Sequence, residues 1–165
     1  MKILVLGAAR SGKDSLAELW NKNFGLTYKS SSEMANELFI YDELKDKYGY
    51  STIEECFEDR MNRRTEWYKM ICGFNKDDKA RLTKAILENY DCYVGMRDDA
   101  EFEASKHLFD LIVWVDASER VDNPDSSNKI SKNDAHIVIT NNSDWDSFVE
   151  KSNVVGNIIF NLIKN

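Results

Sequence analysis

The sequence of 165 residues contains only three cysteines and two histidines. Cys56, Cys72 and Cys92 are odd in number, widely spaced and without a C-x-x-C pair, which argues against a disulfide framework and against a zinc site. We expect them to be reduced, buried thiols of a cytosolic protein. His107 and His136 are isolated from any serine or cysteine triad, so the sequence assigns them no chemistry.

Long apolar runs are also lacking, and so is an excess of positive charge. No run approaches the length of a membrane span, and a strand pattern begins almost at Met1, which leaves no room for a signal peptide. The 29 acidic residues outnumber the 22 basic ones and give a net charge of −7. This disfavours broad binding to nucleic acid or to an anionic membrane, but not a local basic pocket. We therefore expect a cytoplasmic protein with neither partner.

The single proline, Pro124, lies in the one low-complexity stretch, Asp122–Asp134, which predicts a surface loop. The rest of the chain alternates between strand and helix patterns, and its length suits one domain over residues 1–165. This alternation predicts a three-layer α/β domain with a mainly parallel sheet. The expected strands are Ile3–Leu6, Leu26–Lys29, Cys92–Met96, Leu111–Val115 and Ile137–Thr140. The expected helices after the first are Glu33–Lys47, Ile53–Phe74, Lys76–Asn89, Asp99–Lys106 and Trp145–Ile163.

The most informative motif follows the first expected strand. Gly7 ends the strand, and Gly12-Lys13 follows after four intervening residues. This spacing is typical of a P-loop, whose backbone N–H groups and lysine bind the phosphates of a nucleotide at a helix N-terminus. The motif predicts a nucleoside triphosphate site; the alternative is a glycine-rich turn without a ligand.

The residue after Lys13 departs from the usual P-loop pattern. That position normally carries a hydroxyl that binds magnesium, whereas here it is Asp14, with Ser15 next. An aspartate can hold hydrated magnesium through its waters, and Ser15 can still donate to a phosphate oxygen. Asp14 and Ser15 are therefore the expected magnesium residues.

Arginines in the expected helix Ile53–Phe74 indicate a second anionic substrate. Arg60 and Arg64 fall on or beside its apolar stripe, where core residues are expected. Because an unpaired buried charge is costly, these side chains need an anionic partner. A phosphate-bearing substrate is one such partner, with Trp67 or Tyr68 packed on its base. Internal salt bridges to Asp or Glu are the alternative, and the sequence does not decide between the two.

Two further arginines follow expected strands. Arg97 comes directly after the third strand, at the carboxyl end, where α/β proteins bind their ligands; an ion pair with Glu101 is the alternative. Arg120 follows the fourth strand and is placed to lie on a nucleobase or to reach a transferring phosphate. Lys129 and Lys132 lie in the following loop. They could be drawn into the site when it closes, but lysines in such loops are more often solvated.

Five motifs occur in a characteristic order, and this order carries most of the weight. They are Ser11-Gly-Lys-Asp-Ser15, Arg60-Met-Asn-Arg-Arg64 with Trp67, Val94-Gly-Met-Arg97 with Glu101, Val115-Asp-Ala-Ser-Glu-Arg120 and Ile139-Thr-Asn-Asn-Ser143. In this order the chain resembles the phage-type deoxynucleoside monophosphate kinases, a branch of the P-loop nucleoside-monophosphate kinases. The resemblance runs from Met1 to about Val149.

The resemblance implies a parallel five-stranded sheet in the order 2-3-1-4-5. It implies a monophosphate-binding helical region at about residues 30–75 and a lid at about residues 118–133. The implied reaction transfers the γ-phosphoryl group of ATP, with Mg²⁺, to a deoxynucleoside 5′-monophosphate. If the chain is phage-encoded, this takes place in the host cytoplasm.

The resemblance also implies the residues of the site. ATP and Mg²⁺ would bind Gly7, Ala8, Arg10, Ser11, Gly12, Lys13, Asp14 and Ser15, with Arg120 and Asn141 beside them. The monophosphate would contact Ser31, Arg60, Arg64, Trp67, Tyr68 and Arg97. The catalytic residues would be Lys13, Arg97 and Arg120.

One departure from the family concerns magnesium. Relatives often carry an aspartate two residues before the arginine matched by Arg97, and here that residue is Gly95. Asp14, Asp98 and Asp116 are candidates to replace the missing contact.

Two other functions and one question of assembly stay open. The chain could be a P-loop kinase of another small metabolite, of the dephospho-coenzyme A type, or a non-catalytic ATP-binding regulatory protein. The apolar stretch Val154–Ile163 could bury within the monomer or form a homodimer.

Overall fold

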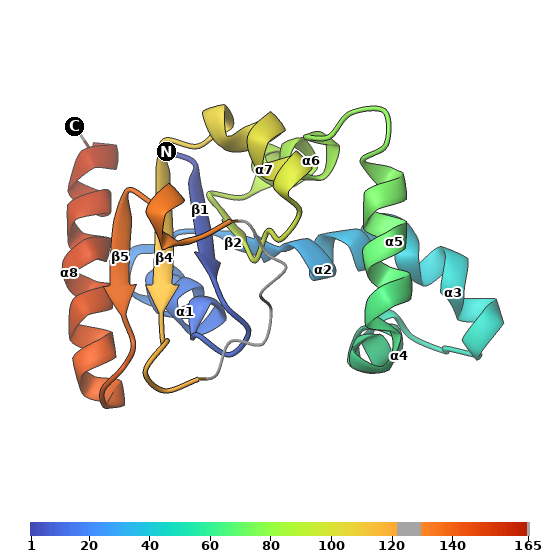
Figure 1. The fold of residues 1–165 in the computed structure, drawn as a ribbon, viewed down its shortest axis with the longest axis horizontal. Helices are drawn as coiled ribbons and strands as arrows, with labels where there is room; N and C mark the ends of the chain where they lie inside the picture. Colours follow the sequence, from blue (N-terminus) through green and yellow to red (C-terminus); the bar gives the residue numbers. More distant parts are fainter. Residues whose placement is uncertain (122–129, 165) are drawn as a thin grey trace.

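Five parallel strands form one sheet in the order β2-β3-β1-β4-β5, as the resemblance implies (Figure 1). The computed structural model describes residues 1–121 and 130–164. The strands are β1 (Ile3–Gly7), β2 (Tyr28–Ser30), β3 (Cys92–Val94), β4 (Leu111–Asp116) and β5 (Ile137–Thr140). Since β1 lies between β3 and β4, the chain crosses over in opposite directions on its two sides. This switch point is where open α/β sheets bind ligands.

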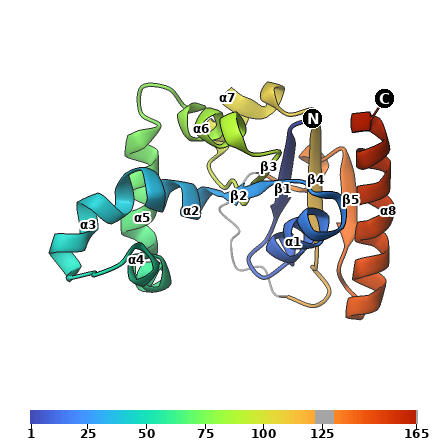
Figure 2. The ribbon, with the colours of Figure 1, turned by 180° about the vertical axis from the view of Figure 1, so that it is seen from behind.

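Helices cover both faces of the sheet and extend beyond its β2 edge. Those on the faces are α1 (Lys13–Phe24), α6 (Arg81–Asn89), α7 (Asp99–Ser105) and α8 (Trp145–Lys164). Those beyond the edge are α2 (Ser31–Ala35), α3 (Tyr41–Tyr48), α4 (Ile53–Asp59) and α5 (Arg64–Phe74). Figures 1 and 2 show α3, α4 and α5 together on the side of the molecule away from α8.

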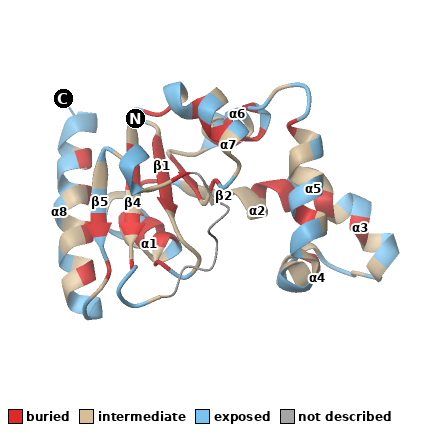
Figure 3. Ribbon diagram, viewed as in Figure 1, coloured by how far each residue is buried: buried red, intermediate tan, exposed pale blue. Residues whose placement is uncertain are grey.

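Residues of the central strand β1 supply two separate cores. Ile3 and Val5 belong to a cluster that α1 and α8 cover, whereas Leu4 and Leu6 belong to the cluster under α6 and α7. Neighbouring residues of a strand point to opposite faces, so an entirely apolar strand requires cover on both sides. Figure 3 shows the buried residues concentrated in the strands and on the inner faces of the helices.

The helices beyond the sheet edge have a small core of their own. It consists of Ala35, Ile40, Leu44, Cys56 and Trp67. The expected helix over residues 33–47 is present, but it starts at Ser31 and contains a π-helical segment, Asn36–Ile40.

The expected continuous helix Ile53–Phe74 is wrong, because it is broken in the middle. α4 ends at Asp59, a 3₁₀ turn covers Arg60–Arg63, and α5 then runs in a different direction (Figure 1). The Asp59 carboxylate accepts hydrogen bonds from the side chains of Asn62 (2.6 Å) and Arg63 (3.1 Å), which stabilises the turn. The spacing of a continuous helix therefore does not apply to the arginines here.

Two other elements begin later than expected. The strand expected from Leu26 starts at Tyr28, and the helix expected from Lys76 starts at Arg81. The second shift follows a turn in which the carboxylate of Asp78 accepts a backbone N–H two residues further on.

No helix within residues 1–121 and 130–164 is long and apolar enough to cross a membrane. Of the expected lid, residues 122–129 lie outside the described residues, and Lys129 is among them. Lys132 is described and lies 3.4 Å from the carboxylate of Asp116.

Candidate active site

β1, the loop after it and α1 place the predicted P-loop at the carboxyl end of the central strand. β1 ends at Gly7 and α1 begins at Lys13. Gly12 precedes the helix with a φ of 99°, and a Cβ there would lie 2.6 Å from the side-chain nitrogen of Asn141. Arg10 also has a positive φ, 61°. Position 12 therefore requires glycine for two reasons: its backbone is left-handed, and there is no room for a Cβ atom.

Polar groups of this loop are available to an anion. No side chain in the described part of the chain caps the N-terminus of α1, so its first-turn N–H groups point outward without a capping acceptor. The Ser11 hydroxyl is buried and finds no hydrogen-bond partner among the described residues. Ser15 lies in the first turn and is half-buried. These donors and the positive end of the helix fit phosphate oxygens.

Lys13 is held close to the loop. Its side-chain nitrogen lies 3.5 Å from the carbonyl oxygen of Ala8 and 3.8 Å from the carboxylate of Asp14, and the residue is only 8% exposed. Burial lowers the pKa of Lys13; Asp14 opposes this effect and Arg97 adds to it. A bound phosphate would supply the negative charge that favours the protonated amine.

Asn141 supports the P-loop from inside the fold. Its side-chain nitrogen donates to the carbonyl of Ser11 at 2.8 Å, and its backbone N–H donates to that of Asp116 at 2.7 Å. The Arg120 guanidinium in turn donates to the carbonyl of Asn141 at 3.1 Å. The predicted nucleotide residues Asn141 and Arg120 thus lie together at the β4–β5 end of the loop, and the Asn141 amide is occupied by the loop itself.

The carboxylates considered for magnesium differ in whether other groups already hydrogen-bond to them or pair with them. Asp116 faces Lys132, and Asp98 accepts a backbone N–H as the N-cap of α7. The Asp14 side chain is 67% exposed, and its carboxylate lies 3.8 Å from the side-chain nitrogen of Lys13. Among the described residues, no three His, Cys, Asp or Glu side chains are grouped to hold a metal ion. The residues therefore fit a magnesium ion held mostly by phosphate oxygens and water, with Asp14 beside it.

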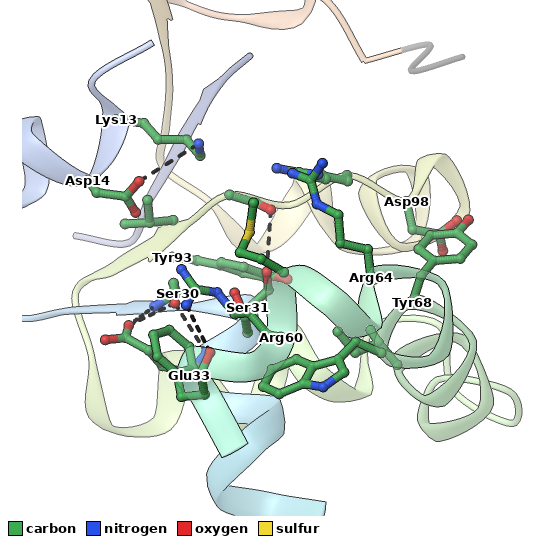
Figure 4. Close-up of a pocket in the computed structure, with 18 of the residues that line it drawn as sticks. Lys13, Asp14, Ser30, Ser31, Glu33, Arg60, Arg64, Tyr68, Tyr93 and Asp98 are labelled. Atoms are coloured by element: carbon green, nitrogen blue, oxygen red, sulfur yellow. Dashed lines mark hydrogen bonds and ion pairs between the residues drawn. The ribbon is translucent and has the colours of Figure 1, made fainter. Parts of the chain in front are cut away.

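A cavity of about 810 Å³ lies between the P-loop and the helices beyond β2. Figure 4 shows Lys13 and Asp14 on one side of it, with Arg60, Arg64 and Tyr68 facing them. The cavity brings together eight of the predicted site residues: Lys13, Asp14, Ser31, Arg60, Arg64, Trp67, Tyr68 and Arg97.

Arg60 and Arg64 reach this cavity from the break between α4 and α5. The guanidinium of Arg60 lies 3.9 Å from the centre of the Phe57 ring and donates to the Phe57 carbonyl at 2.9 Å. Within residues 1–121 and 130–164, neither arginine pairs with a carboxylate, whereas the neighbouring Arg63 pairs with Asp59 at 3.1 Å. Internal salt bridging, the alternative that the sequence left open, is therefore not observed for Arg60 and Arg64.

The expected alternative for Arg97, an ion pair with Glu101, is not observed either. Glu101 is 2% exposed, and its carboxylate accepts hydrogen bonds from Thr83 (2.8 Å) and Tyr93 (3.1 Å) instead. Arg97 is exposed, lines the cavity and, in the described part of the chain, has no carboxylate partner. Three guanidinium groups thus face one cavity without internal neutralisation.

The two aromatic residues proposed for a base have different environments. Trp67 is 4% exposed and packs in the small helical core, with its ring 6.2 Å from that of Phe57. Tyr68 is 53% exposed and lies at the cavity. Tyr68 therefore offers a free ring face, whereas Trp67 mainly supports the wall.

The floor of the cavity contains one buried polar residue that the sequence does not single out, Tyr93. Tyr93 is fully buried and donates to Glu101, while the hydroxyl of Ser31 donates to the carbonyl of Gly95 at 3.3 Å. The available signal was Tyr93 itself, a hydroxyl in an otherwise apolar strand. Because buried hydroxyls need partners, this residue indicates a polar group beneath the strand end.

No protein-family model and no curated protein sequence matches this chain. Solved structures do match. A gluconokinase from Sinorhizobium meliloti is 12% identical over 99% of this chain and 95% of that chain, with a TM-score of 0.51. Shikimate kinases from Aquifex aeolicus and Bacteroides thetaiotaomicron are 14% and 9% identical, both with TM-scores of 0.49. They cover 96% of this chain, and 96% and 98% of their own chains, respectively.

At such low sequence identity the similarity concerns the fold alone. Of these three structures, only the gluconokinase has a TM-score above 0.5, so the comparison of folds rests on it. Together with the strand order and the P-loop, it shows that this chain has the fold of the P-loop kinases.

Proposed function

We propose that this protein is an ATP-dependent kinase of nucleoside 5′-monophosphates, with deoxynucleotides as the first candidates. The observation that carries the proposal is the cavity opposite Lys13 with its three guanidinium groups. An acceptor phosphate supplies the missing negative charge, and arginine is well suited to bind it with two parallel hydrogen bonds. Tyr68 supplies a surface for the base. The preference for deoxyribose rests on the sequence resemblance.

The proposed mechanism needs no covalent intermediate. Phosphoryl transfer requires two phosphates held in line and cancellation of the charge on the moving group. Lys13 would hold the donor phosphates, and Arg64 and Arg97 the acceptor phosphate. Bound Mg²⁺ would neutralise donor charge, with Asp14 and Ser15 as the residues that hold it. The attacking phosphate oxygen is already ionised near neutral pH, so the site requires no general base.

A coupled ADP-release assay with ATP and Mg²⁺ tests this proposal. The panel contains deoxy- and ribonucleoside monophosphates, dephospho-coenzyme A and gluconate. We expect stimulation by one or more deoxynucleoside monophosphates. Stimulation by dephospho-coenzyme A or gluconate alone would identify a kinase of another metabolite. ATP binding with no stimulation by any acceptor would favour the non-catalytic regulatory protein.

Lys13→Met is the matched loss-of-function variant. We expect turnover to fall at least about a hundredfold, because the amine stabilises charge that develops on the transferring group. The fold should remain, since the methionine keeps the apolar stem. Circular dichroism and thermal unfolding provide the control. If the variant loses its secondary structure, or keeps its turnover, Lys13 is not the phosphate-binding residue assigned here.

A further inference from the structure

Glu101 is a buried carboxylate for which phosphoryl transfer itself has no use. It lies in the first turn of α7, four residues after Arg97, and it lines the floor of the cavity while being only 2% exposed. Burying a carboxylate is costly unless several groups hydrogen-bond to it. Its partners therefore indicate what the residue does.

The partners of the carboxylate come from two different parts of the fold. Thr83 of α6 donates its hydroxyl at 2.8 Å, and Tyr93 of β3 donates at 3.1 Å. Next to Thr83, the backbone N–H of Leu82 donates to the side-chain oxygen of Asn75, the residue after α5, at 3.0 Å. Glu101 thus links the third strand to α6 directly, and α6 in turn is joined to the end of the helix that carries Arg64.

The backbone of Glu101 connects it to Arg97. Its N–H donates to the Asp98 carboxylate at 3.1 Å, and this N-cap closes the turn directly after Arg97. Its carbonyl accepts the hydroxyl of Ser105 at 2.6 Å. Arg97 itself has no ion pair within the described residues, and the turn that follows it fixes the backbone from which its side chain extends.

We propose that Glu101 is the positioning residue that holds Arg97 and Arg64 at a fixed separation, by clamping the turn after β3 to the α5–α6 junction. The proposal rests on the proposed function for its kinetic test, because it assigns these two arginines to one acceptor phosphate. A bidentate or two-arginine contact tolerates little error in position, so loosening the clamp weakens acceptor binding and leaves the P-loop unaffected.

The charge on Glu101 tunes the clamp. Burial raises the pKa of Glu101 to about 7, against the opposing effect of the hydrogen bonds from Thr83 and Tyr93. The titratable groups that face it are Tyr93 from β3 and Asp98 from the turn before α7, while α6 and the end of α5 present the neutral Thr83 and Asn75. The ionised carboxylate accepts stronger hydrogen bonds from Thr83 and Tyr93 than a neutral carboxyl or amide does, although burial disfavours its charge.

Glu101→Gln and Thr83→Val test the clamp. The glutamine keeps an oxygen acceptor but cannot ionise, and the valine removes only the α6 contact. We expect the KM for the monophosphate to rise about tenfold in both, with the KM for ATP within about twofold of wild type. Glu103→Gln is the matched control, an exposed glutamate on the same helix, and should leave both constants unchanged.

The opposite results would overturn the proposal. Equal increases in both KM values, or a loss of kcat that simply follows the folded fraction, would mean a structural role only.

A readout without substrate separates this proposal from the proposed function. ¹⁵N relaxation of the Arg97 Nε–H group measures its order in the free protein. We expect a lower order parameter in Glu101→Gln and Thr83→Val than in wild type and Glu103→Gln. If wild type phosphorylates no monophosphate but this order still falls, the clamp stands and the proposed function fails. If wild type is active and the order is unchanged, the clamp fails alone.

Discussion

At the scale of single residues, one backbone angle places the P-loop lysine. Gly95 has a φ of 86°, and a Cβ there would lie 3.3 Å from Cε of Lys13. The kinase family that the sequence resembles often has an aspartate at this position, but an aspartate would be strained here by the left-handed backbone and by the close contact. Gly95 therefore leaves room for the side chain of Lys13, and it supplies no carboxylate at this position.

Gly95→Asp should lower both the stability of the protein and its affinity for ATP. The left-handed conformation costs a non-glycine residue about 1–2 kcal/mol, and the new carboxylate would compete with ATP phosphates for Lys13. We expect a lower melting temperature and a higher KM for ATP. Gly95→Ala carries the same strain without the charge, so the difference between the two variants isolates the carboxylate. Activity above wild type at limiting Mg²⁺ in Gly95→Asp would contradict this account.

Glu101 should also make stability depend on pH. Its pKa is about 7 in the fold against 4.5 for an ordinary glutamate, so between these values the folded protein holds a proton that the unfolded chain releases. Stability from this group is complete below about pH 4.5 and is lost as the pH rises through 7, by up to about 3 kcal/mol. Melting temperatures of wild type relative to Glu101→Gln should therefore fall from pH 5 to pH 8. Parallel melting curves across this range would exclude the shifted pKa.

At the scale of secondary-structure elements, α8 packs on α1 through a close contact. A Cβ on Gly156 would lie 2.2 Å from the Phe24 ring, which also packs 6.0 Å from Phe160. The small residue therefore sets how closely the two helices approach. The buried side of α8, which includes Phe148 and Ile159, lies within the monomer, whereas Val154, Ile158 and Leu162 are exposed. A homodimer through that exposed side stays a prediction.

Two glycine-to-alanine variants test the helix contact. Gly156→Ala should destabilise the protein by about 1–3 kcal/mol, because the methyl group overlaps the Phe24 ring. Gly73→Ala is the matched control: Gly73 also lies in a helix, and a Cβ there meets nothing within 4 Å. It should stabilise by about 0.5–1 kcal/mol, since alanine restricts the unfolded chain. Denaturant unfolding measures both, and equal effects would show that α8 does not pack as described.

The break between α4 and α5 is the element that forms the acceptor side of the cavity. A continuous helix would place Arg60 and Arg64 one turn apart on one face. The 3₁₀ turn instead brings both side chains to the cavity while Trp67 remains in the helical core.

At the scale of the whole molecule, a chain of net charge −7 concentrates positive charge in one cavity. The acidic surface reduces non-specific binding of polyanions, and the local arginines still attract a small anion. Salt screens such attraction, most strongly for exposed groups.

The KM for the acceptor should therefore depend on ionic strength. Raising NaCl from about 0.05 M to 0.5 M should increase the monophosphate KM several-fold, because the Debye length falls well below the width of the cavity. Arg97→Met, with one cation fewer, should show a shallower dependence. An acceptor KM insensitive to salt in wild type would argue against arginine-dominated binding.

The sequence alone predicts a mainly parallel α/β sheet and the P-loop, whereas the strand order is implied by the resemblance to a known kinase family. Strand alternation, the Gly7-to-Lys13 spacing and helix starts are short-range signals, because the residues that produce them are neighbours in the chain. It also predicts which residues meet at the cavity, through the order of the motifs.

Only the tertiary structure decides how those side chains are used. The break after Asp59, the burial of Trp67 and the contact of Arg60 with Phe57 in place of any described carboxylate depend on interactions that local periodicity does not contain. Glu101 shows this most clearly: the chain places it one helical turn after Arg97, which suggests an ion pair. Its carboxylate is buried between α6 and β3 and accepts hydrogen bonds from Thr83 and Tyr93 instead. The Arg97 side chain is exposed and stays in contact with water, so the two residues do not meet.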